Sequence, residues 1–308
     1  MPPTTPPYRT LLLLLLALLA FASAFVATRA AVAVIHPSAL ACGRYLTASL
    51  VFAAMALAKA PTRPIGREWI RLAVCGALGI GLYNIGFNQG IHEVPAGTTS
   101  LIMNGVIPLG TALGAIALLR EKIGWRWWLA MAGAVAGLLA IALGRDGRLG
   151  GSGIPWLLVA SACGVVLNLG QKPLLPRMGA LSVTSWIIWF GTLPLLPWAP
   201  QLVSDLRAHP AALVQVLYLG VVPGALAYLL WAIAMRRFSA AHTGMTLFTL
   251  PAQVVFFAWL FLGELPAPSA LAGGALIILS VAWAAWPRGQ QSPVPKAPID
   301  TPTKSIAP

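Results

Sequence analysis

Polar side chains recur at helical spacing inside otherwise apolar stretches of this sequence. The four sets are Ser100, Asn104, Pro108 and Thr111; His242, Thr246, Thr249 and Gln253; Gly81, Asn84 and Asn88; and Ser161, Gly164, Asn168 and Gln171. Steps of three and four place each set on one face of a helix. An amide facing lipid costs several kcal/mol, so these faces should meet other helices or a wet cavity. Hydrogen bonds between helices are one interpretation. The lining of a binding cavity is the other, and four stripes together favour it.

A cavity of this kind would offer amides, hydroxyls and aromatic rings to a bound molecule. The residues expected to line it are Asn84, Asn88, Asn104, Asn168, Gln171, Thr249, Gln253 and Trp231, with Trp186, Trp189 and Tyr228 as further aromatic walls. Such a lining suits a neutral or zwitterionic small molecule with an apolar part. No Asp or Glu lies in the middle of an apolar stretch. We therefore expect no metal site, no cofactor and no buried carboxylate relay.

Arg44 is the one charge well inside an apolar stretch, where it costs about 2.5–3.5 kcal/mol on the insertion scale. It either extends outward to the membrane surface, because it lies close to the start of its helix, or it binds a substrate carboxylate. Pro108 and Pro251 each free the carbonyl four residues earlier in the helix. They are either static kinks or hinges, and the sequence leaves both alternatives open.

Two glutamates mark the ends of equivalent segments. Glu121 follows Pro108 by 13 residues, and Glu264 follows Pro251 by the same 13. That separation is about 20 Å along a helix, which places both carboxylates at the membrane boundary. We expect them to be structural, each lying near the amino-terminal end of the next helix, where the helix dipole favours an anion.

The elements that carry these residues must be membrane helices. Of the 308 residues, 58% are hydrophobic and 9% are charged, and the mean hydropathy is +0.82. A soluble domain of this composition could not keep its apolar surface out of water. Ten stretches have about the length that a span requires: residues 11–33, 38–58, 69–91, 96–118, 125–143, 154–173, 180–199, 211–235, 240–262 and 268–286. The first contains Ala22-Ser23-Ala24, which imitates a signal-peptide cleavage site, but we expect this helix to be retained.

The chain is built from two related halves. Residues 96–121 recur as residues 239–264 at a shift of 143 residues, which indicates two homologous units. We expect five-helix repeats at 10–144 and 150–286. They would be flanked by a short cytoplasmic tail at 1–9 and a disordered cytoplasmic tail at 287–308, which is rich in proline and polar residues.

The basic residues indicate orientation. The net charge of +13 is concentrated in the gaps between apolar stretches, so it does not indicate nucleic-acid binding. Of the 20 Lys and Arg residues, 15 lie on the side that holds both termini and 4 on the opposite side. Both termini are therefore expected in the cytoplasm. Because each half has five helices, the halves must enter the membrane in opposite directions. We predict an all-α integral membrane protein with ten transmembrane helices in two inverted-topology repeats.

These features resemble the EamA-domain branch of the drug/metabolite transporter superfamily. Each unit has a small-residue opening, a proline inside its fourth helix and a glutamate at the end of that helix. The segment from Pro37 to Arg44 resembles the family's second helix, which typically carries an arginine there. The resemblance covers about residues 10–286. It implies a ten-helix transporter of the cytoplasmic membrane, often an exporter of amino acids or related small metabolites, with a central cavity between its halves.

The partners implied are a small-molecule substrate and the lipid bilayer. Protons are the candidate coupling ion, with His242, His92 and Glu93 as the nearest titratable groups. A homodimer is a possible partner arrangement, and the sequence does not decide between it and a monomer.

Two other classes of function compete with a carrier. A channel or scaffold without coupled transport has no sequence feature against it. The segment Gly150-Gly151-Ser152-Gly153 matches the G-x-S-G of intramembrane serine hydrolases, but no histidine lies in a helix centre to act as the base. We expect no enzyme activity and no catalytic residue.

Overall fold

The computed structural model describes residues 7–94, 96–143, 152–262 and 268–285, and the regular elements within these ranges are helical. The first half holds α1 (Pro7–Ala31), α2 (Pro37–Ala58), α3 (Glu68–Gly76), α4 (Tyr83–Glu93), α5 (Ala96–Leu119) and α6 (Trp125–Leu143). The second half holds α7 (Ile154–Gln171), α8 (Leu175–Thr192), α9 (Ala199–Ala208), α10 (Ala212–Leu219), α11 (Ala227–Arg237), α12 (Ala240–Met245), α13 (Leu250–Leu262) and α14 (Pro268–Ala285). Short 3-10 or π stretches join them: η1 (Ala77–Leu82), η2 (Lys172–Leu174), η3 (Leu193–Trp198), η4 (Gly220–Leu226) and η5 (Thr246–Thr249).

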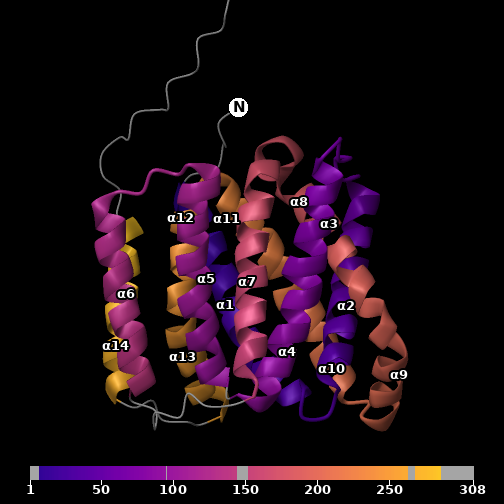
Figure 1. The fold of residues 1–308 in the computed structure, drawn as a ribbon. Coiled ribbons are helices and arrows are strands. Elements are labelled where there is room, and N and C mark those ends of the chain that lie inside the picture. Colours follow the sequence, from indigo (N-terminus) through magenta and orange to yellow (C-terminus); the bar gives the residue numbers. More distant parts are fainter. Residues whose placement is uncertain (1–6, 95, 144–151, 263–267, 286–308) are drawn as a thin grey trace, which may run out of the picture.

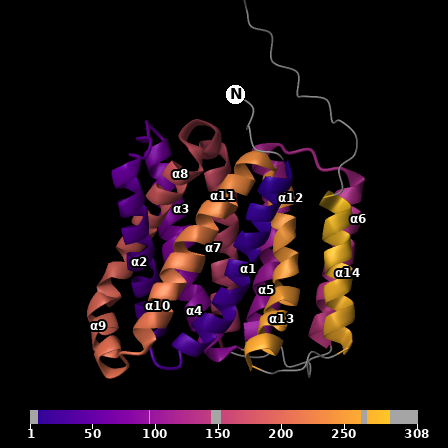
Figure 2. The same cartoon turned by 180° about the vertical axis from the view of Figure 1, so that it is seen from behind.

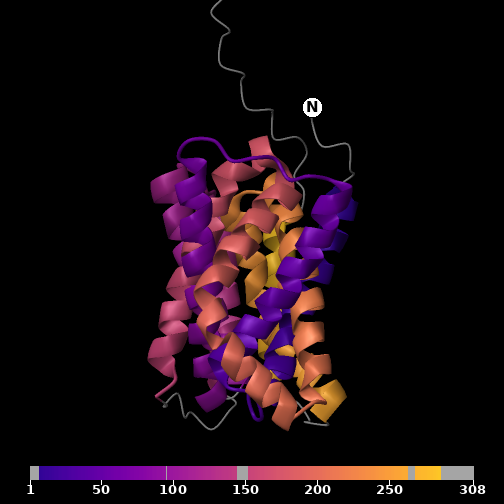
Figure 3. The same cartoon turned by 90° about the vertical axis from the view of Figure 1, so that its right-hand side faces the viewer.

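The long helices run roughly side by side along one axis, and they still do so when the bundle is turned by 90° (Figures 1 and 3). Six helical stretches of the described residues are long and apolar enough to cross a membrane: Arg9–Ala31, Pro37–Ala58, Glu68–Glu93, Thr98–Leu119, Ile154–Ala208 and Ala212–Arg237. A further apolar helix, Leu271–Trp283, is shorter. The outward-facing Leu57, Leu118 and Val214 are 92%, 74% and 71% exposed, as a surface that meets lipid should be.

The ends of the predicted segments differ in places from the structure. The expected tail at 1–9 is helical from Pro7 onward, while the expected tail at 287–308 lies outside the described residues. Helical structure continues through 154–208, where the sequence predicts two helices, 154–173 and 180–199. The direction changes within this stretch at Gly179, whose φ is +78° and ψ 161°. That conformation is open essentially only to glycine, so Gly179 makes the turn between the two expected helices.

Two π-helical stretches stand at equivalent places in the two halves. η1 lies between α3 and α4, and η4 lies between α10 and α11. Their first residues, Ala77 and Gly220, are 143 residues apart, which is the shift that relates the halves. Short π-helical turns inside α-helices occur frequently at functional sites. Here Tyr83 follows η1 directly, and Tyr228 lies one residue beyond the start of α11, after η4.

Equivalent elements of the two halves also touch each other. The hydroxyl groups of Ser49 on α2 and Thr192 on α8 are 2.8 Å apart and share a hydrogen bond, although they are 143 residues apart in the chain. α6 and α14, which end the two halves, pack against one another at one edge of the bundle (Figures 1 and 2). A Cβ at Gly137 would lie 2.6 Å from the backbone oxygen of Gly273. This close approach fits the helix-packing role of small residues in membranes.

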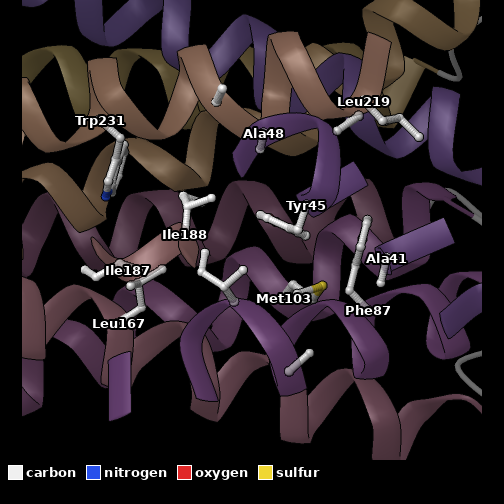
Figure 4. Packing of buried hydrophobic residues seen from close by; sticks show 14 of the residues in the cluster. Ala41, Tyr45, Ala48, Phe87, Met103, Leu167, Ile187, Ile188, Leu219 and Trp231 are labelled. Atoms are coloured by element: carbon white, nitrogen blue, oxygen red, sulfur yellow. The ribbon is translucent and has the colours of Figure 1, made fainter. Parts of the chain in front are cut away.

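The buried core lies between the two halves. It combines side chains from α2, α4, α5, α7, α8 and α11, and Figure 4 shows Tyr45, Phe87, Met103, Leu167 and Trp231 among them. Tyr45 and Met103 are fully buried. This packing sets the distance between the helices that surround the candidate site.

Candidate functional site: a central cavity between the two halves

A cavity lies in the middle of the bundle. The volume in which the centre of a water molecule fits is ≈ 80 Å³, which is room for a few waters or one small ligand group. Its walls are Phe21, Ala24, Phe25, Arg44, Tyr83, Phe87, Asn104, Ile107, Gly164, Leu167, Asn168, Tyr228, Trp231, Leu247 and Leu250. These residues come from α1, α2, α4 and α5 in the first half and from α7, α11, η5 and α13 in the second. Most of the lining is apolar or aromatic.

The lining repeats with the chain. Five pairs of lining residues are separated by 143 positions: Phe21 and Gly164, Ala24 and Leu167, Phe25 and Asn168, Asn104 and Leu247, and Ile107 and Leu250. The halves therefore present equivalent faces of equivalent helices to one shared space. The repeat relates the backbone positions of the wall, but the side chains within each pair are chemically different.

Arg44 is the only charged residue among the described lining residues, and it is only 4% exposed. Its Nη1 donates to Oδ1 of Asn84 over 3.4 Å, and its guanidinium carbon lies 5.3 Å from the centre of the Tyr45 ring. Its Nε is buried without a hydrogen-bond partner among the described residues. Arg44 therefore does not extend outward to the membrane surface. Its equivalent in the second half, Ile187, is not part of the lining.

The two lining asparagines use their amide groups differently. Asn168 donates to Oγ1 of Thr111 over 3.3 Å and accepts from Nε1 of Trp231 over 3.2 Å, so it mainly orients the indole ring. Asn104 donates to both the backbone oxygen and the hydroxyl of Ser100, over 2.9 and 3.0 Å. Because both amide hydrogens of Asn104 go to Ser100, its side-chain oxygen is the group it can offer to a ligand.

Several residues expected in the cavity lie elsewhere. Asn88 donates to the backbone oxygen of Pro37, and Gln253 donates to Oγ1 of Thr249. Gln171 is buried with an unpartnered amide nitrogen. None of Asn84, Asn88, Gln171, Thr249 and Gln253 is part of the lining, although Asn84 contacts Arg44 directly. These stripes extend over several helical turns, and the cavity wall includes only some of their residues.

The expected aromatic walls divide in the same way. Trp231 and Tyr228 line the cavity. Trp186 and Trp189 do not, which corrects the sequence-based expectation. Trp186 packs against Trp69, with ring centres 5.0 Å apart, and its indole donates to the backbone oxygen of Thr62 in the loop after α2. Both tryptophans belong to an aromatic cluster away from the central space, because α8 turns this face toward α2 and α3.

The two prolines are not equivalent in the structure. Pro108 lies inside α5, whereas Pro251 is the second residue of α13, directly after the 3-10 stretch η5. A proline is tolerated in the first turn of a helix because the hydrogen bond it lacks would be absent there anyway. Asn104 and Leu247, the residues four positions before the two prolines, both line the cavity. The carbonyl of Leu247 accepts from the backbone nitrogen of Leu250, so Pro251 does not leave it free.

Glu121 caps a helix other than the expected one. Its two carboxylate oxygens accept from the backbone nitrogens of Ala240 and Ala241, over 2.8 and 3.1 Å, at the start of α12. The sequence predicts a contact with the start of the next helix, α6, because sequence order alone identifies only the helix that follows Glu121 in the chain. The carboxylate thus joins the end of α5 to the second half of the chain. Glu264 lies outside the described residues.

Nothing in the described residues supports a hydrolytic or metal centre. Ser152 is exposed and donates to the carboxylate of Glu93, so it has no histidine base. The described residues contain no cluster of three potential metal ligands.

The apolar part of the wall was not found from the sequence. Phe21 and Phe25 lie in a leucine-rich stretch, and Leu247 and Leu250 lie between polar positions, so none of them is distinctive by type. The repeat could have identified one of these residues, because Leu247 lies 143 positions after Asn104 and is therefore its equivalent in the second half.

Comparisons with known proteins agree with this architecture. The EamA-like transporter family matches residues 8–143 and 151–286. A "Probable terminal-alkyne amino-acid exporter" from Streptantibioticus cattleyicolor is 34% identical over 270 residues, which cover 87% of this chain and 90% of that protein. The "Uncharacterized transporter YdfC" of Bacillus subtilis is 28% identical over 260 residues, covering 84% and 85%. A crystal structure with 19% identity covers 91% of this chain and 97% of its own, with a TM-score of 0.68, and so shares the fold.

Both halves of the chain match the same family model, and the matches together cover most of its length. The chain therefore belongs to the EamA-like transporter family, within the drug/metabolite transporter superfamily, as an all-helical, multi-pass membrane transporter that is not an enzyme.

Proposed function

We propose that this protein is a secondary transporter that exports a small neutral or zwitterionic metabolite, an amino acid or a related compound, by alternating access. The observation that carries the proposal is the central cavity, whose walls come in repeat-related pairs from both halves. A space shared by two equivalent units can open toward either side of a membrane when one unit rocks against the other. A scaffold has no need of such a space.

The full topology belongs to the same proposal. In it, ten transmembrane helices form two inverted repeats, so that both termini lie on one side of the membrane, which we propose is the cytoplasmic side. α1 begins and α14 ends at the same end of the bundle, which supports this arrangement (Figures 1 and 2). The excess of Lys and Arg in the sequence on that side gives the orientation. The equivalent π stretches η1 and η4 immediately precede the helical turns that carry the cavity-lining Tyr83 and Tyr228, so both halves interrupt regular α-helix at matched places beside the cavity.

The lining gives the expected size and character of the substrate. Aromatic and aliphatic side chains make most of the wall, and a few polar groups are aimed at its interior, as is usual for small-molecule sites. The relative from Streptantibioticus cattleyicolor is named as a probable exporter of a terminal-alkyne amino acid, which is a small zwitterion with an apolar side chain. The same chemical class matches the character of this lining, which combines apolar and aromatic side chains with a few polar groups.

Counterflow in proteoliposomes tests the carrier proposal. Vesicles containing the purified protein are loaded with an unlabelled apolar amino acid, and uptake of the labelled compound is followed from outside. A carrier should accumulate label transiently above equilibrium, because exchange is faster than net flux. A channel would equilibrate the label without overshoot, and a scaffold would give the rate of empty vesicles; either result would contradict the proposal.

A further inference from the structure

Arg44 is a buried cation without a carboxylate partner among the described residues. A charge removed from water without an opposite charge is among the costliest features a fold can carry. The partial contacts of Arg44 are neutral: an amide oxygen of Asn84 at 3.4 Å and the ring of Tyr45. Nε has no partner at all among the described residues, and the residue lines the cavity.

The described acidic residues of the chain all bind groups other than Arg44. Of its seven Asp and Glu, four are described. Glu68 pairs with Arg177, Glu93 accepts from Ser152, Glu121 caps α12, and Asp205 accepts from the backbone of His36 and from Gln201. The other three, Asp146, Glu264 and Asp300, lie outside the described residues and, in the sequence, outside the middle of every apolar stretch. The described part of the cavity therefore carries a charge of +1 that no described residue neutralises.

We infer that the substrate supplies the missing charge: the cavity recognises amphiphilic monocarboxylates, with Arg44 binding the carboxylate and the apolar wall holding the tail. This inference rests on the proposed transport function and redefines its substrate class: a carboxylate on an apolar tail is the required feature, and apolar amino acids are one group of compounds that carry it. Arginine presents a planar fork of donors that matches a carboxylate. The residues around it fit an apolar tail, because Phe21, Phe25 and Phe87 line the same small space.

An amino group is not required for recognition at such a site. A zwitterion would bring an ammonium group that finds no anionic partner among the described lining residues, which offer it neutral groups such as the side-chain oxygen of Asn104, tyrosine hydroxyls and aromatic faces. A simple carboxylate cancels the charge of Arg44 and adds none. The deaminated analogue of an apolar amino acid should therefore bind at least as tightly as the amino acid itself.

The asymmetry of the halves points the same way. The position equivalent to Arg44 is Ile187, a buried apolar residue outside the lining. One head group is thus recognised from one half of the protein, and the opposite half contributes Leu167, Leu247 and Leu250 to the tail region. A substrate with a charge at both ends would not match this wall.

Ligand-induced thermal stabilisation of the full-length protein in nanodiscs tests the inference. Four probes share one chain length and differ in the head group: hexanoate, norleucine, hexylamine and hexan-1-ol. Chloride, added as its sodium salt, is the control for binding of a simple inorganic anion. Each is measured on the wild type, on Arg44→Gln, and on Arg177→Gln as a matched control that removes an exposed arginine. Specific binding raises the unfolding temperature by mass action.

Hexanoate and norleucine should stabilise the wild type and Arg177→Gln, with hexanoate at least as effective, whereas hexylamine and hexan-1-ol should not. Arg44→Gln should weaken hexanoate binding at least about tenfold, because a hydrogen-bonded charge pair is lost. The unliganded Arg44→Gln protein should unfold at the same or a higher temperature than the wild type, since an unpaired buried charge has gone. A purely structural Arg44 would instead lower that temperature.

Equal binding of hexylamine or hexan-1-ol, stabilisation by chloride alone, undiminished hexanoate binding by Arg44→Gln, or no response to any probe would each overturn the carboxylate inference. None of these results bears on counterflow, which tests the transport function separately. A carrier that exchanges substrate but fails these binding criteria would keep the proposed function and lose the substrate class.

Discussion

Replacing Glu121 tests whether the two halves are joined at the end of α5. In Glu121→Ala, the backbone nitrogens of Ala240 and Ala241 lose acceptors at 2.8 and 3.1 Å. Loss of a helix cap costs about 0.5–2 kcal/mol, and loss of an anion at the amino-terminal end of a helix adds about 0.3–1 kcal/mol. Ser239 also caps α12 by accepting from His242, so one turn of the helix stays anchored. We expect the unfolding free energy to fall by about 1–3 kcal/mol.

The measurement is thermal unfolding of purified variants in nanodiscs, with ligand affinity determined in parallel. Glu121→Gln keeps one acceptor oxygen without the charge and should lie between Ala and the wild type. Lys122→Ala changes an exposed neighbour and should match the wild type. Affinity should be unaffected in all three variants, because Glu121 is not part of the cavity wall. A Glu121→Ala protein as stable as the wild type, or one that folds well and cannot bind ligand, would refute the capping role.

Two further substitutions test the fold. Gly179→Ala should lower the free energy of unfolding by about 1–3 kcal/mol, because a φ of +78° is unfavourable for a residue with a side chain, although no atom lies within 4 Å of the added Cβ. The control Gly124→Ala, where the space around the added Cβ is similarly open, should lower it little. Equal thermal unfolding of the two variants would contradict this account. Gly137→Ala should destabilise the α6–α14 pair by about 1–3 kcal/mol, because the new Cβ would meet a backbone oxygen at 2.6 Å. Unchanged thermal unfolding of this variant would mean that the two helices can separate at no cost.

Much of the fold was readable from the sequence because its signals are local. A membrane helix is recognised by a run of about 20 apolar residues, and the 143-residue shift identifies the repeat. The π stretches η1 and η4 were not predicted, because a change from i+4 to i+5 hydrogen bonding leaves no compositional mark beyond small residues such as Gly79 and Gly224. The change of direction at Gly179 falls between the predicted segments 154–173 and 180–199. The helical turns that continue from Leu174 to Met178 were not predicted.

The candidate site was only partly predictable because periodicity fixes the face of a residue and not its depth. Asn104 and Asn168 lie on the predicted faces and line the cavity, whereas Gln253 lies on such a face, donates to Thr249 and is not part of the lining. Contacts between distant segments were invisible as well. The carboxylate of Glu121 was expected at the next helix and is found at α12, because tertiary packing brings the beginning of α12 within hydrogen-bonding distance of it.

Alternating access at the cavity is tested most directly by a cysteine in its wall. Ala24 lines the cavity and tolerates a small change, and the native Cys42, Cys75 and Cys163 are buried and are replaced by alanine. In oriented vesicles, Ala24→Cys should react with a membrane-impermeant thiol reagent added to either side, and bound substrate should slow both reactions. The exposed control Lys59→Cys should react from one side only. Reaction of Ala24→Cys from a single side under every condition would contradict alternating access at this cavity.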